Sequence, residues 1–248
     1  MPEIITLLLT FFIGVVASFM GSTVGGGGLV SIPFLIFTGL PPQVAIATDR
    51  FGSVGQALIA FYKFWKAKKI VWKYVAILSI LSIVGSIIGA NILLKTKSEI
   101  LTNVIGIILI LLLPFIFIKK DIGIKRKKVT RLKMIIGLVI YFLIQTFTGF
   151  FGGGTGTLIF YTLMIAFGYT IIEANATNNI PWILLAISSF IIFAINGIVD
   201  YKIGTILLLG MITGGYIGAH VAIKKGDKWV KTLFAVLVII SGIKLLFF

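Results

Sequence analysis

Long apolar segments separated by short polar turns make up almost the whole chain. They lie near residues 4–20, 25–41, 43–62, 74–94, 99–118, 133–149, 154–170, 172–191, 203–223 and 228–247. A helix needs roughly 20 residues to cross the hydrocarbon core of a bilayer, and most segments have about that length. The pattern therefore predicts an all-α integral membrane protein with almost no mass outside the membrane.

The chain also matches itself when it is shifted by 129 positions without a gap. The matched pairs include Gly25 with Gly154, Gly27 with Gly156 and Thr48 with Thr177. A second block, GSIIGANILLK, meets GGYIGAHVAIK at the same shift. Many secondary transporters consist of two such copies around a site at the membrane midplane. We predict two homologous repeats, about 1–119 and 130–248, each of about five helical segments with a glycine-broken second segment, joined by a basic cytoplasmic linker at 120–129.

Basic residues predict how the two repeats lie in the membrane. Three clusters, in residues 62–73, 119–133 and 224–231, hold 17 of the 22 lysines and arginines. Such charge collects in cytoplasmic loops. The loop equivalent to 62–73 in the second repeat contains only Lys202, whereas the 224–231 cluster is rich, so the bias has changed sides. Placing all three clusters inside requires inverted repeats. An alternative is that the second segment re-enters from one face, which would give parallel repeats of four spans and export the 224–231 lysines.

Composition excludes several other classes of protein. The residues are 59% hydrophobic and only 12% charged, so a soluble catalytic domain does not fit. The net charge of +15 lies in short clusters between apolar segments, which argues against a nucleic-acid partner. The chain contains no phosphate loop of the form GxxxxGK and no cysteine. We expect no cofactor and no metal site, and no oligomeric state is predicted.

Two glycine clusters carry the strongest chemical signal. The first is Gly25, Gly26, Gly27 and Gly28, and the second is Gly152, Gly153, Gly154 and Gly156. Glycine permits backbone conformations closed to other residues and leaves N–H groups unshielded. A helix that starts after each cluster would point its positive end at the break, which makes an anion site. The alternative is that the small residues only let helices pack closely.

Each cluster is followed, about twenty residues later, by polar residues within an apolar segment. The first set is Thr48, Asp49 and Arg50, and the second is Asn175, Thr177, Asn178 and Asn179. Ionisable residues inside the membrane are costly and by default suggest function. We expect Arg50, Thr48 and the asparagines to offer donors to a small oxyanion while Asp49 tunes or couples its movement. The competing interpretation is a structural Asp–Arg pair with asparagines capping a helix.

The order of these motifs resembles the TauE/SafE family of membrane permeases, also described as sulfite exporters. The stretches are GGGGLVSIPFL, GLPPQVAIATDRFGS, a lysine-rich loop and GSIIGA, followed by a second copy, so the resemblance covers essentially the whole chain. It implies passage of a sulfur oxyanion such as sulfite, or of an organosulfonate, across the cytoplasmic membrane. The matching positions are Gly25 to Gly28 and Thr48, then Gly152 to Gly154, Gly156 and Thr177. Arg50 departs from the small or polar residue expected there.

These observations predict a secondary permease for a small anion that works by alternating access, driven by protons or other ions or passive. An anion channel is one alternative, and a permease for another small anion such as a carboxylate is a second. An enzyme is not expected, because the few candidate catalytic groups, among them His220 and Asp200, form no recognisable motif such as HExxH.

Overall fold

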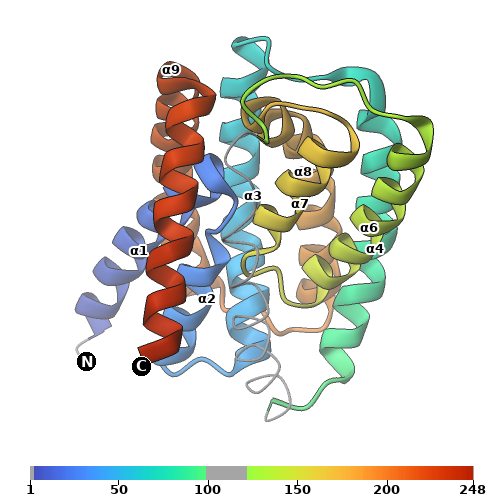
Figure 1. The fold of residues 1–248 in the computed structure, drawn as a ribbon. Helices are drawn as coiled ribbons and strands as arrows, with labels where there is room; N and C mark the ends of the chain where they lie inside the picture. Colours follow the sequence, from blue (N-terminus) through green and yellow to red (C-terminus); the bar gives the residue numbers. More distant parts are fainter. Residues whose placement is uncertain (1–2, 99–121, 248) are drawn as a thin grey trace.

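The computed structural model describes residues 3–98 and 122–247, which form helices and connecting loops (Figure 1). The predicted segment at 99–118 lies outside the described residues. The helices are α1 (Glu3–Val24), α2 (Gly28–Phe37), α3 (Pro42–Lys66), a short 3-10 helix (Trp72–Tyr74), α4 (Val75–Lys95), α6 (Arg131–Phe150), α7 (Thr155–Ala166), α8 (Ile171–Ile195) and α9 (Tyr201–Phe247). Non-helical backbone at Gly226 divides α9 into two arms.

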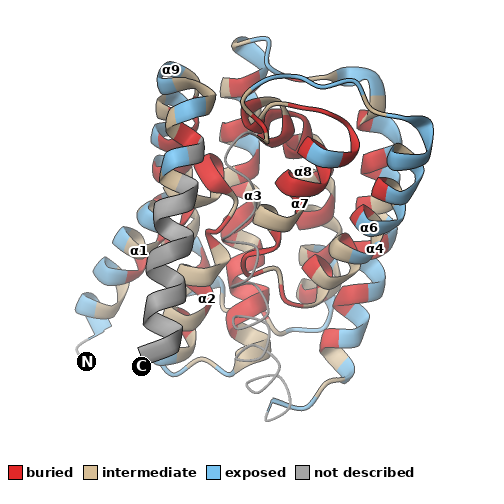
Figure 2. Ribbon diagram, in the orientation of Figure 1, coloured by how far each residue is buried: buried red, intermediate tan, exposed pale blue. Residues whose placement is uncertain are grey.

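The described chain is an all-α integral membrane protein. Five of its helices are long and apolar enough to cross a bilayer. Their outward faces expose large apolar side chains, such as Leu8 (57% exposed), Ile80 (61%) and Leu143 (60%), which suit contact with lipid. Buried residues lie on the inward faces instead (Figure 2). Buried polar residues such as Asp49 and Arg50 are therefore enclosed by the bundle.

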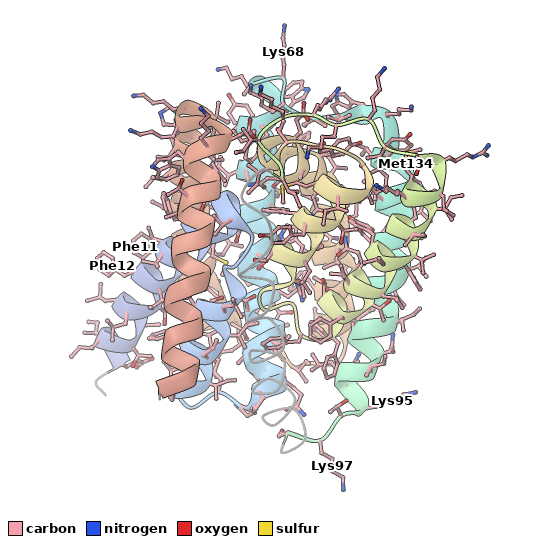
Figure 3. All side chains as sticks on the ribbon, in the orientation of Figure 1. Phe11, Phe12, Lys68, Lys95, Lys97 and Met134 are labelled. Carbon is pink, nitrogen blue, oxygen red and sulfur yellow. The ribbon has the colours of Figure 1, made fainter. Side chains whose placement is uncertain are left out.

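The loops gather at two opposite ends of the bundle. At the lysine-rich end, comprising residues 67–73, 122–130, 167–170 and 224–228, the Lys127 amide donates to the Gly168 carbonyl at 2.9 Å. The Ile172 amide donates to the Asp227 carboxylate at 2.9 Å there. At the far end, comprising residues 38–41, 95–98 and 196–200, Gln43 Nε2 donates to the Thr96 carbonyl at 2.8 Å. Figure 3 shows Lys68 at one end and Lys95 and Lys97 at the other.

Each half begins with a helical hairpin that returns to the end it started from. Helix α1 leaves the far end and α2 returns to it, whereas α6 leaves the lysine-rich end and α7 returns to it (Figure 1). Helices α2 and α7 have 10 and 12 residues, which is about 15 and 18 Å of helix and too short to cross about 30 Å of hydrocarbon. The second segment of each half thus differs from a full crossing.

The re-entrant hairpins do not make the halves parallel. Because the first helix of each half turns back together with the second, the hairpin adds no net crossing, and the helices that follow it set the direction of the half. Helix α3 starts at the far end and α8 starts at the lysine-rich end, so these two helices run in opposite directions. Each bound of α8 lies 129 residues after the matching bound of α3. This is the arrangement that inverted repeats require. The repeats themselves, 1–119 and 130–248 with the linker 120–129, stay a prediction.

Two threonines at equivalent positions make crossed contacts between the halves. Thr48 Oγ1 accepts a hydrogen bond of 3.0 Å from the Asp200 amide. Thr177 Oγ1 accepts one of 3.0 Å from the Val71 amide. A shift of 129 residues converts Thr48 to Thr177 and Val71 to Asp200, so the two bonds exchange places. Each half therefore anchors a loop of the other in the same way, as a two-fold relation between them would require.

Candidate functional site

The tips of the two hairpins meet near the centre of the bundle, main chain against main chain (Figure 1). Gly25 has a φ of +83°, and a Cβ there would lie 2.6 Å from the carbonyl carbon of Gly156. A Cβ on Gly28 would lie 3.1 Å from the Cα of Gly153. Only glycine combines this positive φ at position 25 with room for the contact between Gly25 and Gly156. Because α2 and α7 begin at these tips, their positive N-terminal ends are directed at the same region.

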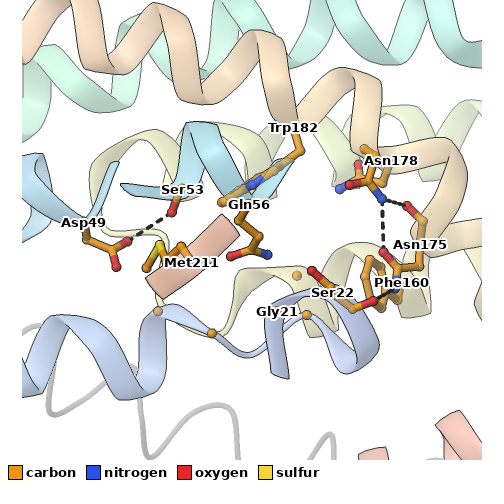
Figure 4. Close-up of a pocket in the computed structure, with 15 residues that line it drawn as sticks. Gly21, Ser22, Asp49, Ser53, Gln56, Phe160, Asn175, Asn178, Trp182 and Met211 are labelled. Atoms are coloured by element: carbon orange, nitrogen blue, oxygen red, sulfur yellow. Dashed lines mark hydrogen bonds between the residues drawn. The ribbon is translucent and has the colours of Figure 1, made fainter. Parts of the chain in front are cut away.

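A cavity of about 50 Å³ lies beside the tips and is lined by residues of both halves (Figure 4). One water needs ~10–15 Å³ of such volume, so the cavity has room for about three to five waters or one small ion. Its lining residues are Gly21, Ser22, Gly25, Gly27, Gly28, Asp49, Ser53, Gln56, Gly156, Phe160, Asn175, Asn178, Asn179, Trp182 and Met211.

Two hydrogen-bond donors in the cavity wall are buried without a partner. These are Ser22 Oγ, near the end of α1, and Trp182 Nε1, in the middle of α8, neither of which has a hydrogen-bond partner among the described residues. An unsatisfied buried polar group costs about 1–3 kcal/mol. The cost is removed when a ligand oxygen or water comes within hydrogen-bond distance of these atoms, so Ser22 and Trp182, which both line the cavity, are candidate donors to an acceptor bound there.

The asparagines of α8 connect the cavity to the first hairpin. Asn175 Nδ2 donates to the Ser22 carbonyl at 2.6 Å, and Asn179 Nδ2 donates to the Asn175 carbonyl at 2.8 Å. Asn178 Oδ1 instead accepts from the Tyr141 hydroxyl at 2.7 Å. The amino group of Asn178, with two N–H donors, has no acceptor among the hydrogen bonds of the described residues. The wall is therefore rich in donors.

Asp49 and Arg50 are adjacent in α3 but face different surroundings. Asp49 is 5% exposed, lines the cavity and accepts hydrogen bonds from Ser31 and Ser53. Arg50, 2% exposed, donates from Nη2 to the Thr148 carbonyl at 2.7 Å, and its guanidinium lies 5.4 Å from the centre of the Trp182 ring. The ion pairs among the described side chains do not join these two residues. Arg50 thus reaches the cavity only through Trp182.

The acidic residue at the start of α8 belongs to the lysine-rich end and not to the cavity. Glu173 closes a capping box with Thr170 and pairs with Arg126 at 2.9 Å. This hydrogen bond raises the pKa of the Arg126 guanidinium above its usual value. Glu173 therefore stabilises the helix start and the adjoining loop, as acidic residues in a first turn do.

The structure brings together one part of the predicted site. Predicted residues that line the cavity are Gly25, Gly27, Gly28, Asp49, Gly156, Asn175, Asn178 and Asn179. Those outside its lining are Gly26, Thr48, Arg50, Gly152, Gly153, Gly154 and Thr177. The two threonines hold loops, and Gly152 to Gly154 form the second tip next to Arg50 and Gly28.

Sequence reasoning missed several lining residues that a helical pattern could have revealed. Neighbours on one helix face are three or four positions apart. Counting from Asp49 reaches Ser53 and Gln56, and counting from Asn178 reaches Trp182. The shift of 129 positions also pairs Ser53 with Trp182. The other missed residues, Gly21, Ser22, Phe160 and Met211, carry no comparable signal.

Comparisons with known proteins agree on the kind of protein. The family model described as "Sulfite exporter TauE/SafE" matches residues 10–245. A "Probable membrane transporter protein" of Haemophilus influenzae is 28% identical over 237 residues, which covers 95% of this chain and 91% of the relative. The "Probable membrane transporter protein YfcA" of Escherichia coli is 25% identical, covering 96% and 88%. YjnA of Bacillus subtilis, with the same description, is 27% identical, covering 97% and 98%. No solved structure gives a significant match.

Proposed function

Because the chain belongs to the sulfite exporter TauE/SafE family, whose relatives are membrane transporters, we propose that it is a secondary permease that carries a small anion across the cytoplasmic membrane. The observation that carries the proposal is the donor-lined cavity where the two hairpin tips meet. Its unpartnered donors, Ser22 Oγ and Trp182 Nε1, suit the oxygens of an anion, and the N-terminal ends of α2 and α7 favour negative charge there.

The proposed substrate is a sulfur oxyanion such as sulfite, or a small organosulfonate. Several acceptor oxygens on one compact centre match donors that converge from α1, α3 and α8. The cavity of about 50 Å³ is suited to about four or five heavy atoms. This size supports sulfite, sulfate or methanesulfonate over a longer sulfonate such as sulfoacetate. The family description, which names sulfite, supports the same class.

The proposed mechanism is alternating access between the two halves. The cavity is lined by α1, α3 and the start of α2 in the first half, by α7 and α8 in the second, and by Met211 of α9. The tips touch through glycine main chain, which leaves few side chains to interlock the two hairpins. Movement of one hairpin and its neighbours against the other would open the cavity to each end in turn. An anion held by both halves would cross without a continuous pore.

The test is counterflow in proteoliposomes loaded with unlabelled anion. With sulfite, sulfate, methanesulfonate and acetate compared at equal pH on both sides, we expect saturable uptake of at least one sulfur oxyanion. Trp182→Phe removes the cavity donor and keeps an aromatic side chain, so the concentration for half-saturation should rise about 10- to 100-fold, as for a hydrogen bond to a charged group.

The matched control is Trp72→Phe, which removes the same indole N–H from a side chain that is 57% exposed and outside the cavity. It should leave counterflow unchanged. If Trp182→Phe and Trp72→Phe had the same effect on counterflow, the cavity would not be the site that binds the anion. Ohmic single-channel currents without counterflow would identify an anion channel instead.

A further inference from the structure

The cavity proposed to hold an anion contains a carboxylate. Asp49 is the only ionisable side chain among the described residues that line it. From α1, α2, α7, α8 and α9 the lining residues contribute only neutral groups. The charged groups at the ends of these helices face elsewhere: Glu173 pairs with Arg126, and Glu3 with Lys202. A negative Asp49 would repel an incoming anion at close range.

The nearest positive charge is Arg50, which stands one side chain away from the cavity. Its guanidinium lies over the ring of Trp182, a lining residue, while its donor group Nη2 is held by the Thr148 carbonyl. With the cavity empty, Arg50 and an ionised Asp49 balance each other. Adding an anion alone leaves one excess negative charge, and adding a proton alone leaves one excess positive charge. Uncompensated buried charge is strongly disfavoured.

Of the three ways of loading the cavity, with an anion alone, a proton alone or both, only the entry of a proton together with a monoanion keeps the buried charge at zero. In the loaded state Asp49 is neutral and the anion balances Arg50. In the empty state the proton and the anion have both left. The empty and the loaded state therefore contain no uncompensated charge, whereas the states with only an anion or only a proton each contain one.

The groups around Asp49 suit a side chain that changes its protonation state. Ser31 Oγ, in the first turn of α2, donates to the carboxylate, and Ser53 Oγ lies 3.4 Å from its other oxygen. A hydroxyl can donate to a carboxylate or accept from a carboxylic acid. Ser31 Oγ also lies 3.3 Å from the Gly27 carbonyl oxygen. When a protonated Asp49 donates to Ser31 Oγ, the Ser31 hydroxyl can donate to this carbonyl instead. Both forms of Asp49 therefore keep hydrogen-bond partners.

We propose that Asp49 carries the proton of a proton–anion symport cycle. A proton from the water on one side binds an Asp49 carboxylate oxygen as the anion enters, and both leave to the water on the other side. No other bond forms or breaks. The proposal rests on the permease function proposed above and adds the coupling ion and the residue that binds it.

The first experiment uses the wild-type protein in proteoliposomes with a pH-sensitive dye inside. Counterflow at equal pH identifies which of sulfite, sulfate and methanesulfonate is carried, and its absence for all of them would defeat the permease function itself. For methanesulfonate, whose charge does not change near neutral pH, an acidic exterior should drive accumulation of about tenfold per pH unit. Anion uptake should acidify the interior. Uptake without proton movement, or uptake driven by a sodium gradient at equal pH, would overturn the coupling while leaving the permease intact.

The second experiment uses variants on the carried anion. Asp49→Asn should lose accumulation in a pH gradient, so that the internal concentration stays near the external one, and the rate of any anion exchange that it retains should no longer depend on pH. Asp49→Glu should keep accumulation and shift its dependence on pH. The matched control, Asp227→Asn, changes a carboxylate at the lysine-rich end that accepts from the Ile172 amide, and should accumulate anion as the wild type does. Accumulation of methanesulfonate by Asp49→Asn equal to that by the wild type would contradict the proposal. Methanesulfonate is the decisive substrate, because sulfite binds a proton itself and can accumulate in an alkaline interior without Asp49.

Discussion

Helices α3 and α8 occupy equivalent places in the two halves, yet only one of them carries charge at the cavity. Asp49 and Arg50 of α3 correspond to Asn178 and Asn179 of α8 at the shift of 129 positions. Asp49 and Asn178 both line the cavity. Asn179 lines it as well, whereas Arg50 turns toward Thr148. The comparison teaches that two equivalent helices can place different chemistry at one cavity, with a carboxylate on one side and amides on the other.

The threonines that precede these pairs show the opposite behaviour. Thr48 and Thr177 bind loops of the other half with the same geometry. The threonine contacts are thus duplicated in the two helices, whereas the charged side chain at the cavity is present in only one of them. Substitutions at the duplicated contacts should have equal effects, and substitutions at the unlike positions should have unequal effects.

The largest expected difference is in the accessibility of the two helix ends. Lys66 ends α3, and Asn196 follows α8 directly. Because these helices run in opposite directions, Lys66→Cys and Asn196→Cys should label from opposite sides of the membrane. The chain contains no cysteine that would interfere. An impermeant maleimide applied to sealed vesicles of known orientation should label one variant fully and the other only after lysis. Labelling of both from one side would contradict the inverted arrangement.

The next largest effect concerns Arg50 and Asn179, which occupy equivalent positions in α3 and α8. Arg50→Met leaves Asp49 as an uncompensated buried charge, which should reduce the free energy of unfolding by about 3–5 kcal/mol. Asn179→Met loses the hydrogen bonds that its Nδ2 donates to the Asn175 carbonyl at 2.8 Å and to Asn175 Oδ1 at 3.3 Å, together worth about 1–2 kcal/mol. Thermal unfolding in detergent measures both variants. Adding Asp49→Asn to Arg50→Met should recover part of the loss, and a strictly additive double variant would mean that the two charges do not interact.

The contact between the hairpin tips can be tested with alanine. A Cβ on Gly156 would overlap the main chain of Gly25, so Gly156→Ala should cost about 1–3 kcal/mol of stability and open the tips. Gly26→Ala is the matched control, since the nearest atom to a Cβ there is 3.9 Å away. Protein yield and melting temperature report the difference. If both alanines were tolerated alike, the tips would not touch as described.

The smallest effect should come from the crossed threonines. Thr48→Val and Thr177→Val each leave a loop amide without its acceptor and should each reduce stability by about 1 kcal/mol. Because the two bonds have the same length, the two losses should agree within experimental error. A clear inequality, measured by thermal unfolding with Thr205→Val as an exposed control, would show that the halves do not share this role.

The starts of the helices and the membrane class followed from the sequence, but the path of the chain did not. Apolar length marks α1 and α6 as membrane segments, yet it says nothing about α2 and α7 turning back, because depth depends on contacts such as Gly25 with Gly156. Asp49 could be selected as a buried carboxylate. That Arg50 turns away from the cavity could not be predicted, since its direction is fixed by the Thr148 carbonyl from a distant helix. Ser22 and Trp182 likewise matter only because packing leaves them unpartnered.

The most direct test of the central claim is to locate a bound anion between the hairpin tips. Selenate or another electron-rich oxyanion, added to the protein at a concentration that competes in counterflow, can be located by anomalous diffraction. We predict a selenium position inside the cavity, with oxygens at hydrogen-bond distance from Ser22 Oγ and Trp182 Nε1. A cavity left empty at that concentration, with the anion bound elsewhere in the bundle, would contradict the account.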